Sequence, residues 1–292
     1  MANEQQIDAA AAGTISLGGD LAVNRLGYGA MRITGRGVWG EPADRPEAIR
    51  VLKRAVELGV DFIDTADSYG PNVSEEIIAE ALHPYPAGLI IGTKGGFERS
   101  GPDRWEENGH PDHLRRALEG SLRRLKVDRI DLWQLHRIAK GVPEDEQFGV
   151  LAEFVKQGKV KHIGLSEVGV DQIKRARRVI PIVSVQNRYN ISDREWEDVV
   201  DYCDRENIAF IPWFPLGAGS LDHSKHEPDA IETVAKRHHA STMQVALAWL
   251  LARSKMMLVI PGTSKTKHVE ENIASASLTL SDDDLALLSG KR

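Results

Sequence analysis

The chain has 292 residues, of which 41% are hydrophobic and 27% charged, so it can bury a full core and is not a disordered protein. A net charge of −6 without a basic patch argues against nucleic-acid and anionic-membrane partners. The single cysteine, Cys203, excludes a disulfide framework and a cysteine-rich zinc site. No apolar run could span a membrane and no signal-peptide pattern is present, so we expect a cytoplasmic protein without a metal.

Short apolar runs alternate with amphipathic segments along most of the chain. Residues 1–13 are expected to form a flexible leader, followed by a hairpin of Thr14–Leu17 and Leu21–Val23 around Gly18-Gly19. Strands are then predicted at Arg25–Tyr28, Val60–Ile63, Leu89–Gly92, Ile130–Gln134, His162–Leu165, Ile182–Val185, Ala209–Pro212 and Leu258–Ile260. Helices are predicted at Pro46–Leu58, Ser74–Leu82, Pro111–Leu125, Glu144–Gln157, Val170–Arg178, Arg194–Glu206, in two parts from Asp229 to Arg253, and at Thr266–Ala276.

Repeated strand–helix units indicate a parallel sheet, because parallel neighbours need a crossover, and eight units favour a (β/α)₈ TIM barrel. Without a linker or a break in composition, residues 1–292 are expected to form one domain. The alternative is an open doubly wound sheet, which usually carries a glycine fingerprint directly before a helix. The segment Gly35–Gly40 matches that fingerprint, but prolines follow it. We therefore interpret it as a mobile substrate loop.

Four chemically matched side chains lie just past predicted strand ends. Asp64 and Tyr69 follow the second strand, Lys94 follows the third and His136 the fourth. Each alone is more often a packed or surface residue, but catalytic groups of such barrels gather at these ends. Together they fit carbonyl reduction, with Tyr69 as proton donor and His136 polarising the carbonyl. In this hypothesis Lys94 lowers the pKa of Tyr69, and Asp64 orients Lys94.

The segment GVDFIDTADSYG, the lysine strand end and WQLH resemble the Asp-Tyr-Lys-His tetrad of the aldo-keto reductase superfamily, with similarity over about residues 25–272. The resemblance implies the catalytic roles given above and NADPH as the cofactor. It also implies cofactor contacts by Ala30, Met31, Ser166, Glu167, Gln186, Trp213, Leu216, Ala218, Gly262, Thr263, Ser264, Lys265, His268, Glu271 and Asn272.

Several of these implied contacts have a chemical consequence. Ser166 and Gln186 would bind the nicotinamide carboxamide, while Trp213 would stack on the ring. Glu167 stands where many relatives carry asparagine, and a carboxylate can accept hydrogen bonds but not donate them. The segment 262–265 would bind the adenosine 2′-phosphate. Some relatives carry lysine at position 262 and arginine at 268, where this chain has Gly262 and His268, so NADH is not excluded.

Segments 24–42, 68–86 and 244–254 are similar to those of bacterial pyridoxal reductases in the superfamily. This implies that a small carbonyl substrate, pyridoxal, is reduced to pyridoxine, with Trp39, Tyr69 and His136 around it. Three alternatives remain open: a broad-specificity aldehyde reductase, a Schiff-base lyase using Lys94, and a non-catalytic regulatory subunit. A pair of histidines three residues apart is interpreted as part of a solvated loop rather than a metal site: His223 and His226.

Overall fold

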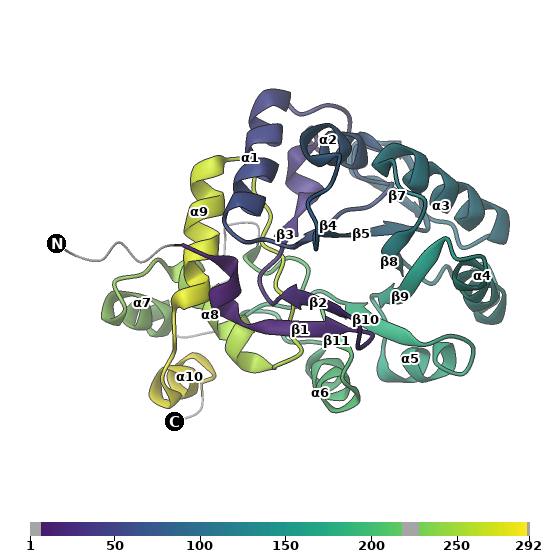
Figure 1. Ribbon diagram of the computed structural model, residues 1–292. Helices are drawn as coiled ribbons and strands as arrows, with labels where there is room; N and C mark the ends of the chain where they lie inside the picture. The colour runs from purple at the N-terminus through teal and green to yellow at the C-terminus, as the bar shows by residue number, and fades with distance from the viewer. Residues whose placement is uncertain (1–6, 218–227, 291–292) are drawn as a thin grey trace.

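A parallel sheet forms the centre of the computed structural model, which describes residues 7–217 and 228–290. Within these residues the strand order is β11-β10-β9-β8-β5-β4-β3 (Figure 1). The strands are β3 (Tyr28–Gly29), β4 (Phe62–Asp64), β5 (Ile90–Gly95), β8 (Ile130–Leu135), β9 (Val160–Ser166), β10 (Ile182–Gln186) and β11 (Ala209–Phe210). Their positions agree with seven of the predicted strands.

The eighth predicted strand, Leu258–Ile260, is present as single bridges instead of a continuous strand. Met257 pairs with Phe210 of β11, and Val259 pairs with Leu26 just before β3. Both pairs are parallel, so this segment joins the two edges of the sheet. The sheet therefore closes, and the predicted (β/α)₈ barrel is confirmed.

Helices surround the barrel, as Figure 1 shows. They are α1 (Arg45–Glu57), α2 (Val73–Leu82), α3 (Pro111–Leu125), α4 (Glu144–Lys156), α5 (Val170–Ala176), α6 (Glu197–Glu206), α7 (Pro228–Arg237), α8 (Thr242–Arg253), α9 (Thr266–Ala274) and α10 (Asp282–Leu288). Short 3₁₀ helices are η1 (Ala9–Ala12), η2 (Ala30–Ile33) and η5 (Ser275–Ser277). Most bounds agree with prediction to within a few residues, but α10 was not predicted.

The periodicity of α1 explains how such a helix forms. Asp44 caps its first turn by accepting a hydrogen bond from the backbone of Glu47. One face is buried at intervals of three and four residues, by Ala48, Val51, Leu52 and Ala55. Cys203 is likewise buried, on the inner face of α6.

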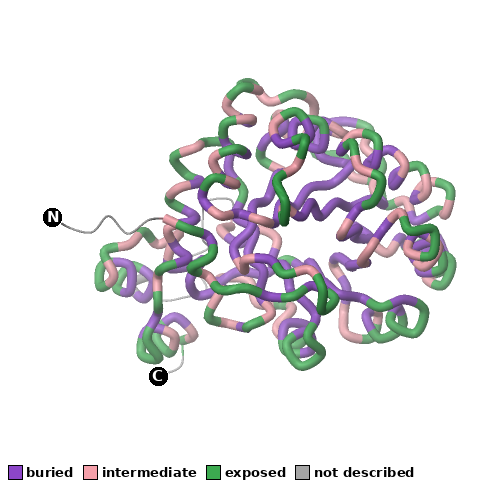
Figure 2. The backbone as a smooth tube through the Cα atoms, viewed as in Figure 1, coloured by how far each residue is buried: buried purple, intermediate pink, exposed green. Residues whose placement is uncertain are grey.

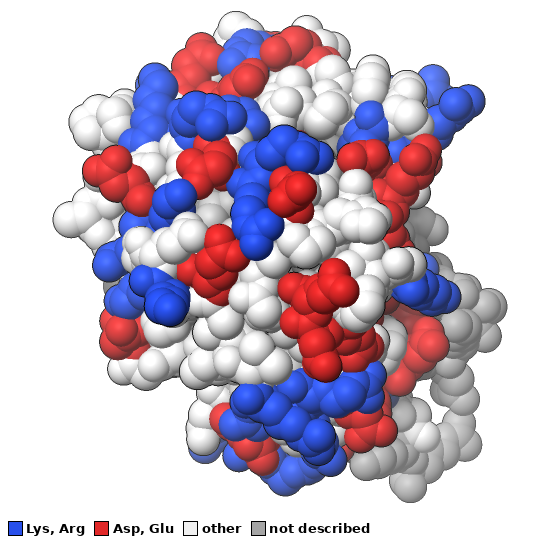
Figure 3. Space-filling view, turned by 90° about the vertical axis from the view of Figure 1, so that its right-hand side faces the viewer, with Lys and Arg blue, Asp and Glu red and all other residues white. Residues whose placement is uncertain are grey.

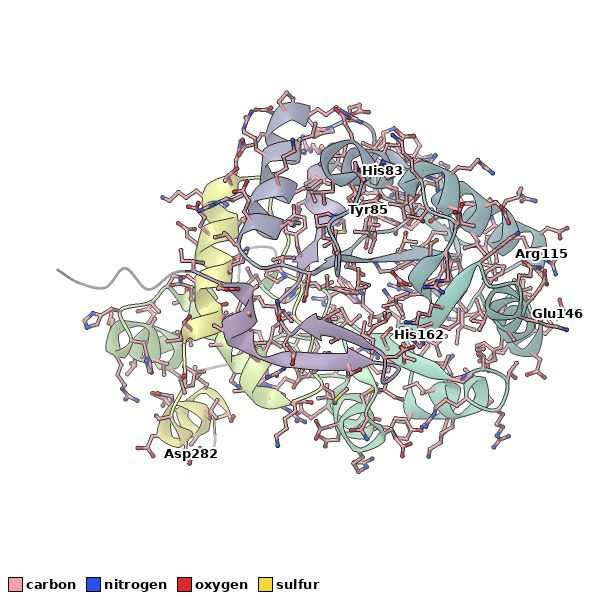
Figure 4. All side chains as sticks on the ribbon, viewed as in Figure 1. His83, Tyr85, Arg115, Glu146, His162 and Asp282 are labelled. Carbon is pink, nitrogen blue, oxygen red and sulfur yellow. The ribbon has the colours of Figure 1, made fainter. Side chains whose placement is uncertain are left out.

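The N-terminal end of the barrel is covered by η1 and a hairpin of β1 (Thr14–Leu17) and β2 (Leu21–Asn24). The hairpin was predicted. The prediction of a flexible leader was wrong for residues 7–13, which include η1. Ala9 is fully buried, and its N–H donates to the carbonyl of Leu58, which caps the end of α1. Asp20 at the hairpin turn contacts His162, labelled in Figure 4, with 2.6 Å between Oδ1 and Nε2.

Figure 2 shows that the strands of the parallel sheet are buried along most of their length. On the face in Figure 3, acidic and basic side chains lie next to one another over most of the surface, in keeping with pairs such as Arg115–Glu153. No helix in the described part of the chain has the length and apolar character needed to cross a bilayer.

Candidate active site

The four residues predicted to be catalytic lie together at the carboxyl ends of β4, β5 and β8. Lys94 is fully buried, and its ammonium donates to Asp64 Oδ2 at 2.7 Å. The same nitrogen lies 3.3 Å from the Tyr69 hydroxyl. His136 follows β8, and the centre of its ring is 5.9 Å from that of Tyr69. A buried cation thus joins a carboxylate to a phenol, with an imidazole on the far side of the phenol.

Burial and charge act in opposite directions on these groups. Burial raises the pKa of Tyr69, and the neighbouring Lys94 offsets only part of that rise. The expected net lowering is therefore wrong, although the effect of Lys94 has the expected sign. Burial would lower the pKa of Lys94, but Asp64 and Tyr69 outweigh it and hold the pKa above its ordinary value. The lysine therefore carries its charge at neutral pH.

His136 stays neutral at physiological pH. Burial, and then the positive charges of Lys94, Arg137 and Arg99, lower its pKa well below the ordinary value. A neutral imidazole keeps one ring N–H, which can donate to a carbonyl oxygen without adding a second positive charge. Ser68 Oγ lies 3.4 Å from the Nδ1 atom.

Asp64, at the end of β4, is held by two glutamines from strands across the barrel, β8 and β10. Its Oδ1 accepts hydrogen bonds from Gln186 Nε2 at 2.9 Å and from Gln134 Nε2 at 3.2 Å. The family resemblance implies that Gln186 binds the nicotinamide carboxamide, but its amide N–H donates to Asp64 in the structure. The glutamines keep the carboxylate in place for Lys94, a function that the sequence pattern did not predict.

Glu167 has an acceptor role that suits a carboxylate. Its Oε1 accepts from the indole Nε1 of Trp213 at 2.5 Å and from the backbone N–H of Arg188 at 2.6 Å. Because both partners donate, an asparagine is not required here. Glu167 thereby fixes the ring of Trp213, which is half-buried at the mouth of the barrel. Ser166, directly before it, accepts from Arg137 at 3.1 Å.

The segment before α9 contains most of the residues predicted to bind the adenosine end. Thr263 Oγ1 accepts from the backbone N–H of Lys265, where α9 begins. The side chains of Ser264 and Lys265 belong to exposed residues. A Cβ at Gly262 would lie 2.5 Å from the carbonyl oxygen of Gly29. A lysine therefore has no room at position 262 unless the backbone moves.

The remaining predicted cofactor residues are spread over three elements. Ala30 and Met31 lie in η2, and Leu216 is partly buried against the core. The others on α9 are His268, 3.4 Å from Thr263 Oγ1, together with exposed Glu271 and buried Asn272. Three positions fall outside the described residues: Ala218, His223 and His226.

An unpredicted hairpin, β6 (Phe97–Gly101) and β7 (Arg104–Glu107), adds an aromatic wall to the mouth. The Phe97 ring centre is 4.7 Å from that of His136, and Trp105 is 6.4 Å from Tyr69. Trp39 is predicted to contact substrate. The guanidinium of Arg99 lies between Trp39 and this wall, with its Cζ 5.7 Å from the ring centre of Trp39 and 3.6 Å from that of Trp105.

The loop containing Trp39, expected to be mobile, makes several hydrogen bonds to neighbouring segments. The N–H of Gly40 donates to Gly70, and the N–H of Gly70 donates back to Val38. Arg99 donates to the carbonyls of Gly37 and Val38 in the same loop. These bonds hold the loop against the segment that contains Tyr69.

Comparison with known proteins decides the family. The sequence model of the Aldo/keto reductase family matches residues 25–292. The chain belongs to the aldo/keto reductase family. The resemblance seen in its tetrad motifs is thereby confirmed, and the protein is an oxidoreductase.

Relatives of this aldo/keto reductase extend over nearly its whole length. An uncharacterized oxidoreductase of Schizosaccharomyces pombe is 52% identical over 283 residues, covering 97% of this chain and 90% of the relative. Pyridoxine 4-dehydrogenase of Escherichia coli is 44% identical over 279 residues, covering 93% and 96%. Among solved structures, a glycerol dehydrogenase from Gluconobacter oxydans superposes with a TM-score of 0.86 at 27% identity, covering 96% of this chain and 94% of the other.

Proposed function

We propose that this aldo/keto reductase reduces a small aldehyde or ketone to the alcohol with NADPH, using Tyr69 as the acid. The observation that carries the proposal is the buried contact of Lys94 with both Asp64 and Tyr69. A charged lysine beside a phenol stabilises the phenolate that remains after proton donation. Family membership supports the reaction class.

The donor set at the mouth fits a nicotinamide cofactor. Trp213 offers a ring face, fixed by Glu167, and Ser166 offers a hydroxyl at the end of β9. The exposed start of α9, with Lys265 beside it, suits an anion. When bound, the reduced cofactor supplies the hydride that forms the new C–H bond.

The protein groups then handle the carbonyl oxygen. His136 donates a hydrogen bond to it, and Tyr69 transfers its proton to it as the C=O π bond is lost. Hydride and proton together convert the carbonyl into the alcohol, so electrons and protons balance. The phenolate left on Tyr69 lies beside the Lys94 ammonium until a proton from solvent restores the phenol.

The arrangement disfavours the Schiff-base lyase alternative. A lysine nucleophile must be neutral and free to attack a carbonyl. The Lys94 ammonium instead has a raised pKa and donates to Asp64, Tyr69 and the carbonyl of Thr65. Forming an imine would break this set of hydrogen bonds in the buried centre of the site.

Lys265→Ala should weaken NADPH binding more than NADH binding, because only NADPH carries the 2′-phosphate. Removal of one charge-assisted hydrogen bond is worth about 1.5–3 kcal/mol. Fluorescence titration with each cofactor measures the two Kd values. Lys267→Ala, at an exposed lysine in the first turn of α9, is the matched control. Equal weakening of both cofactors by Lys265→Ala would show that Lys265 does not bind the phosphate.

The finer proposal is that pyridoxal is the substrate and pyridoxine the product. It is supported by the 44% identity to Escherichia coli pyridoxine 4-dehydrogenase. The aromatic wall of Phe97 and Trp105 also suits a flat ring next to His136.

With NADPH, kcat/KM should be higher for pyridoxal than for 4-nitrobenzaldehyde, because a selective pocket adds contacts that a generic aldehyde lacks. Steady-state NADPH consumption with each aldehyde, measured in parallel, gives the comparison. If pyridoxal is no better a substrate, the enzyme is a broad-specificity aldehyde reductase. The reductase proposal would stand in that case.

A further inference from the structure

Arg137 joins two residues of the proposed site, His136, assigned to the carbonyl, and Ser166, assigned to the nicotinamide. It follows His136 in the chain, and its Nη1 donates to the His136 carbonyl at 2.6 Å and to Ser166 Oγ at 3.1 Å. Its Cζ lies 5.4 Å from the ring centre of Phe97. The same ring also contacts the imidazole of His136 and the indole of Trp105. The guanidinium is therefore anchored beside the site proposed for the carbonyl.

The guanidinium of Arg137 keeps unused hydrogen-bonding capacity. Within the described residues, Nε and Nη2 make no hydrogen bond, and no carboxylate lies within 4.0 Å of the group. Glu167 and Glu107 are the carboxylates whose negative charge acts on the pKa of Arg137. Glu167, however, is already bound to Trp213 and a backbone N–H. A partly buried cation thus presents three free N–H bonds near the mouth.

Arg99, the other arginine at this wall, shows the contrast. Its Nε donates to Arg104, and Nη1 and Nη2 donate to four further carbonyls, those of Val38, Ser68, Gly37 and Gly101. All three guanidinium nitrogens of Arg99 therefore donate hydrogen bonds that join loops. In Arg137 only Nη1 donates.

We propose that Arg137 determines substrate specificity by binding an ionised oxygen attached next to the reacting carbonyl. The preferred substrates are then aromatic aldehydes with an ionised hydroxyl on the adjacent ring carbon, lying against Phe97 and Trp105. Pyridoxal has such an oxygen. The inference rests on the proposed reductase function and names the substrate class of that site. An arginine suits this task because its planar fork binds oxyanions with directed, charge-assisted hydrogen bonds.

The test compares two aldehydes that differ by one oxygen: 3-hydroxypyridine-4-carbaldehyde and pyridine-4-carbaldehyde. For each, kcat/KM is measured with NADPH in the unmodified enzyme and in Arg137→Met. The ratio of the two kcat/KM values should fall by about tenfold to a hundredfold in the variant, the range expected for loss of a charge-assisted hydrogen bond. Comparing ratios between enzymes cancels the different intrinsic reactivity of the aldehydes.

Two further variants serve as controls. Arg137→Lys keeps the charge, so the ratio should recover in part, although the geometry of the fork is lost. Arg178→Met, at an exposed arginine after α5, should leave the ratio unchanged. Thermal melting of each variant checks that it folds, and the NADPH Kd should change less than about threefold in the Arg137 variants.

An unchanged ratio in Arg137→Met would overturn the proposal. So would an equal loss for both aldehydes together with weaker NADPH binding, since Arg137 would then serve the cofactor. If the unmodified enzyme reduces neither these aldehydes nor any other, the reductase proposal itself fails. That result differs from a failure of the Arg137 proposal, because it is seen in the unmodified enzyme before any variant is made.

Discussion

Tyr69→Phe should lower kcat by about 10²–10⁴, the usual contribution of a positioned general acid. The phenyl ring keeps the packing against Trp105 and His136, but no proton remains to be given to the carbonyl oxygen. NADPH affinity should scarcely change, because the hydroxyl faces Lys94 within the tetrad. Single-turnover kinetics with saturating aldehyde, together with a cofactor titration, separate these two effects.

Tyr85→Phe is the matched control for this substitution. The Tyr85 hydroxyl donates to the carbonyl of Leu125 at 2.8 Å, between α2 and the end of α3, and Figure 4 labels the residue. Its removal should leave kcat unchanged. Turnover near the unmodified level in Tyr69→Phe would mean that another group supplies the proton.

Lys94→Met should nearly abolish activity and also destabilise the fold. Loss of the ammonium leaves Asp64 buried without its cation, which typically costs about 3–5 kcal/mol. Since Lys94 lowers the pKa of Tyr69, its removal should raise that pKa further and move the alkaline limb of the pH–rate profile to higher pH. Urea denaturation and the pH dependence of kcat measure the two effects.

The double variant Asp64→Asn, Lys94→Met separates stability from catalysis. Without the stranded carboxylate, the free energy of unfolding should return toward the unmodified value, whereas kcat should not recover. An active Lys94→Met enzyme with an unchanged pH profile would show that Lys94 does not tune the acid.

The tetrad could be predicted because the residues that form it are tied to strand ends. Once Asp64, Lys94 and His136 follow successive parallel strands, barrel closure brings them to one mouth. The balance between burial and charge on Tyr69 could not be predicted in this way. It depends on how much water the neighbouring wall excludes, and the residues of that wall come from a separate hairpin.

That hairpin was missed because its exposure pattern is weak. Most residues of β6 and β7 are exposed or half-buried, so no alternation of apolar side chains indicates strands. A turn signal was present at Pro102-Asp103, between Phe97 and Trp105. Similarly, Ser281 caps the start of α10, and its side chain accepts a hydrogen bond from the backbone N–H of Asp284, a capping pattern readable in the sequence. Gln186, by contrast, could pair with Asp64 only through three-dimensional contacts between separate strands.

The hydrogen bonds of Arg99 allow the substrate-facing loops of this enzyme to change in sequence. The reacting groups are fixed by strand ends and by one another, whereas the aromatic wall belongs to loops and a hairpin that a single arginine joins through backbone carbonyls. Backbone carbonyls exist whatever the side chains are. The loop sequences can therefore change, and with them the range of substrates, while the arginine continues to hold the same loops around an unaltered reaction centre.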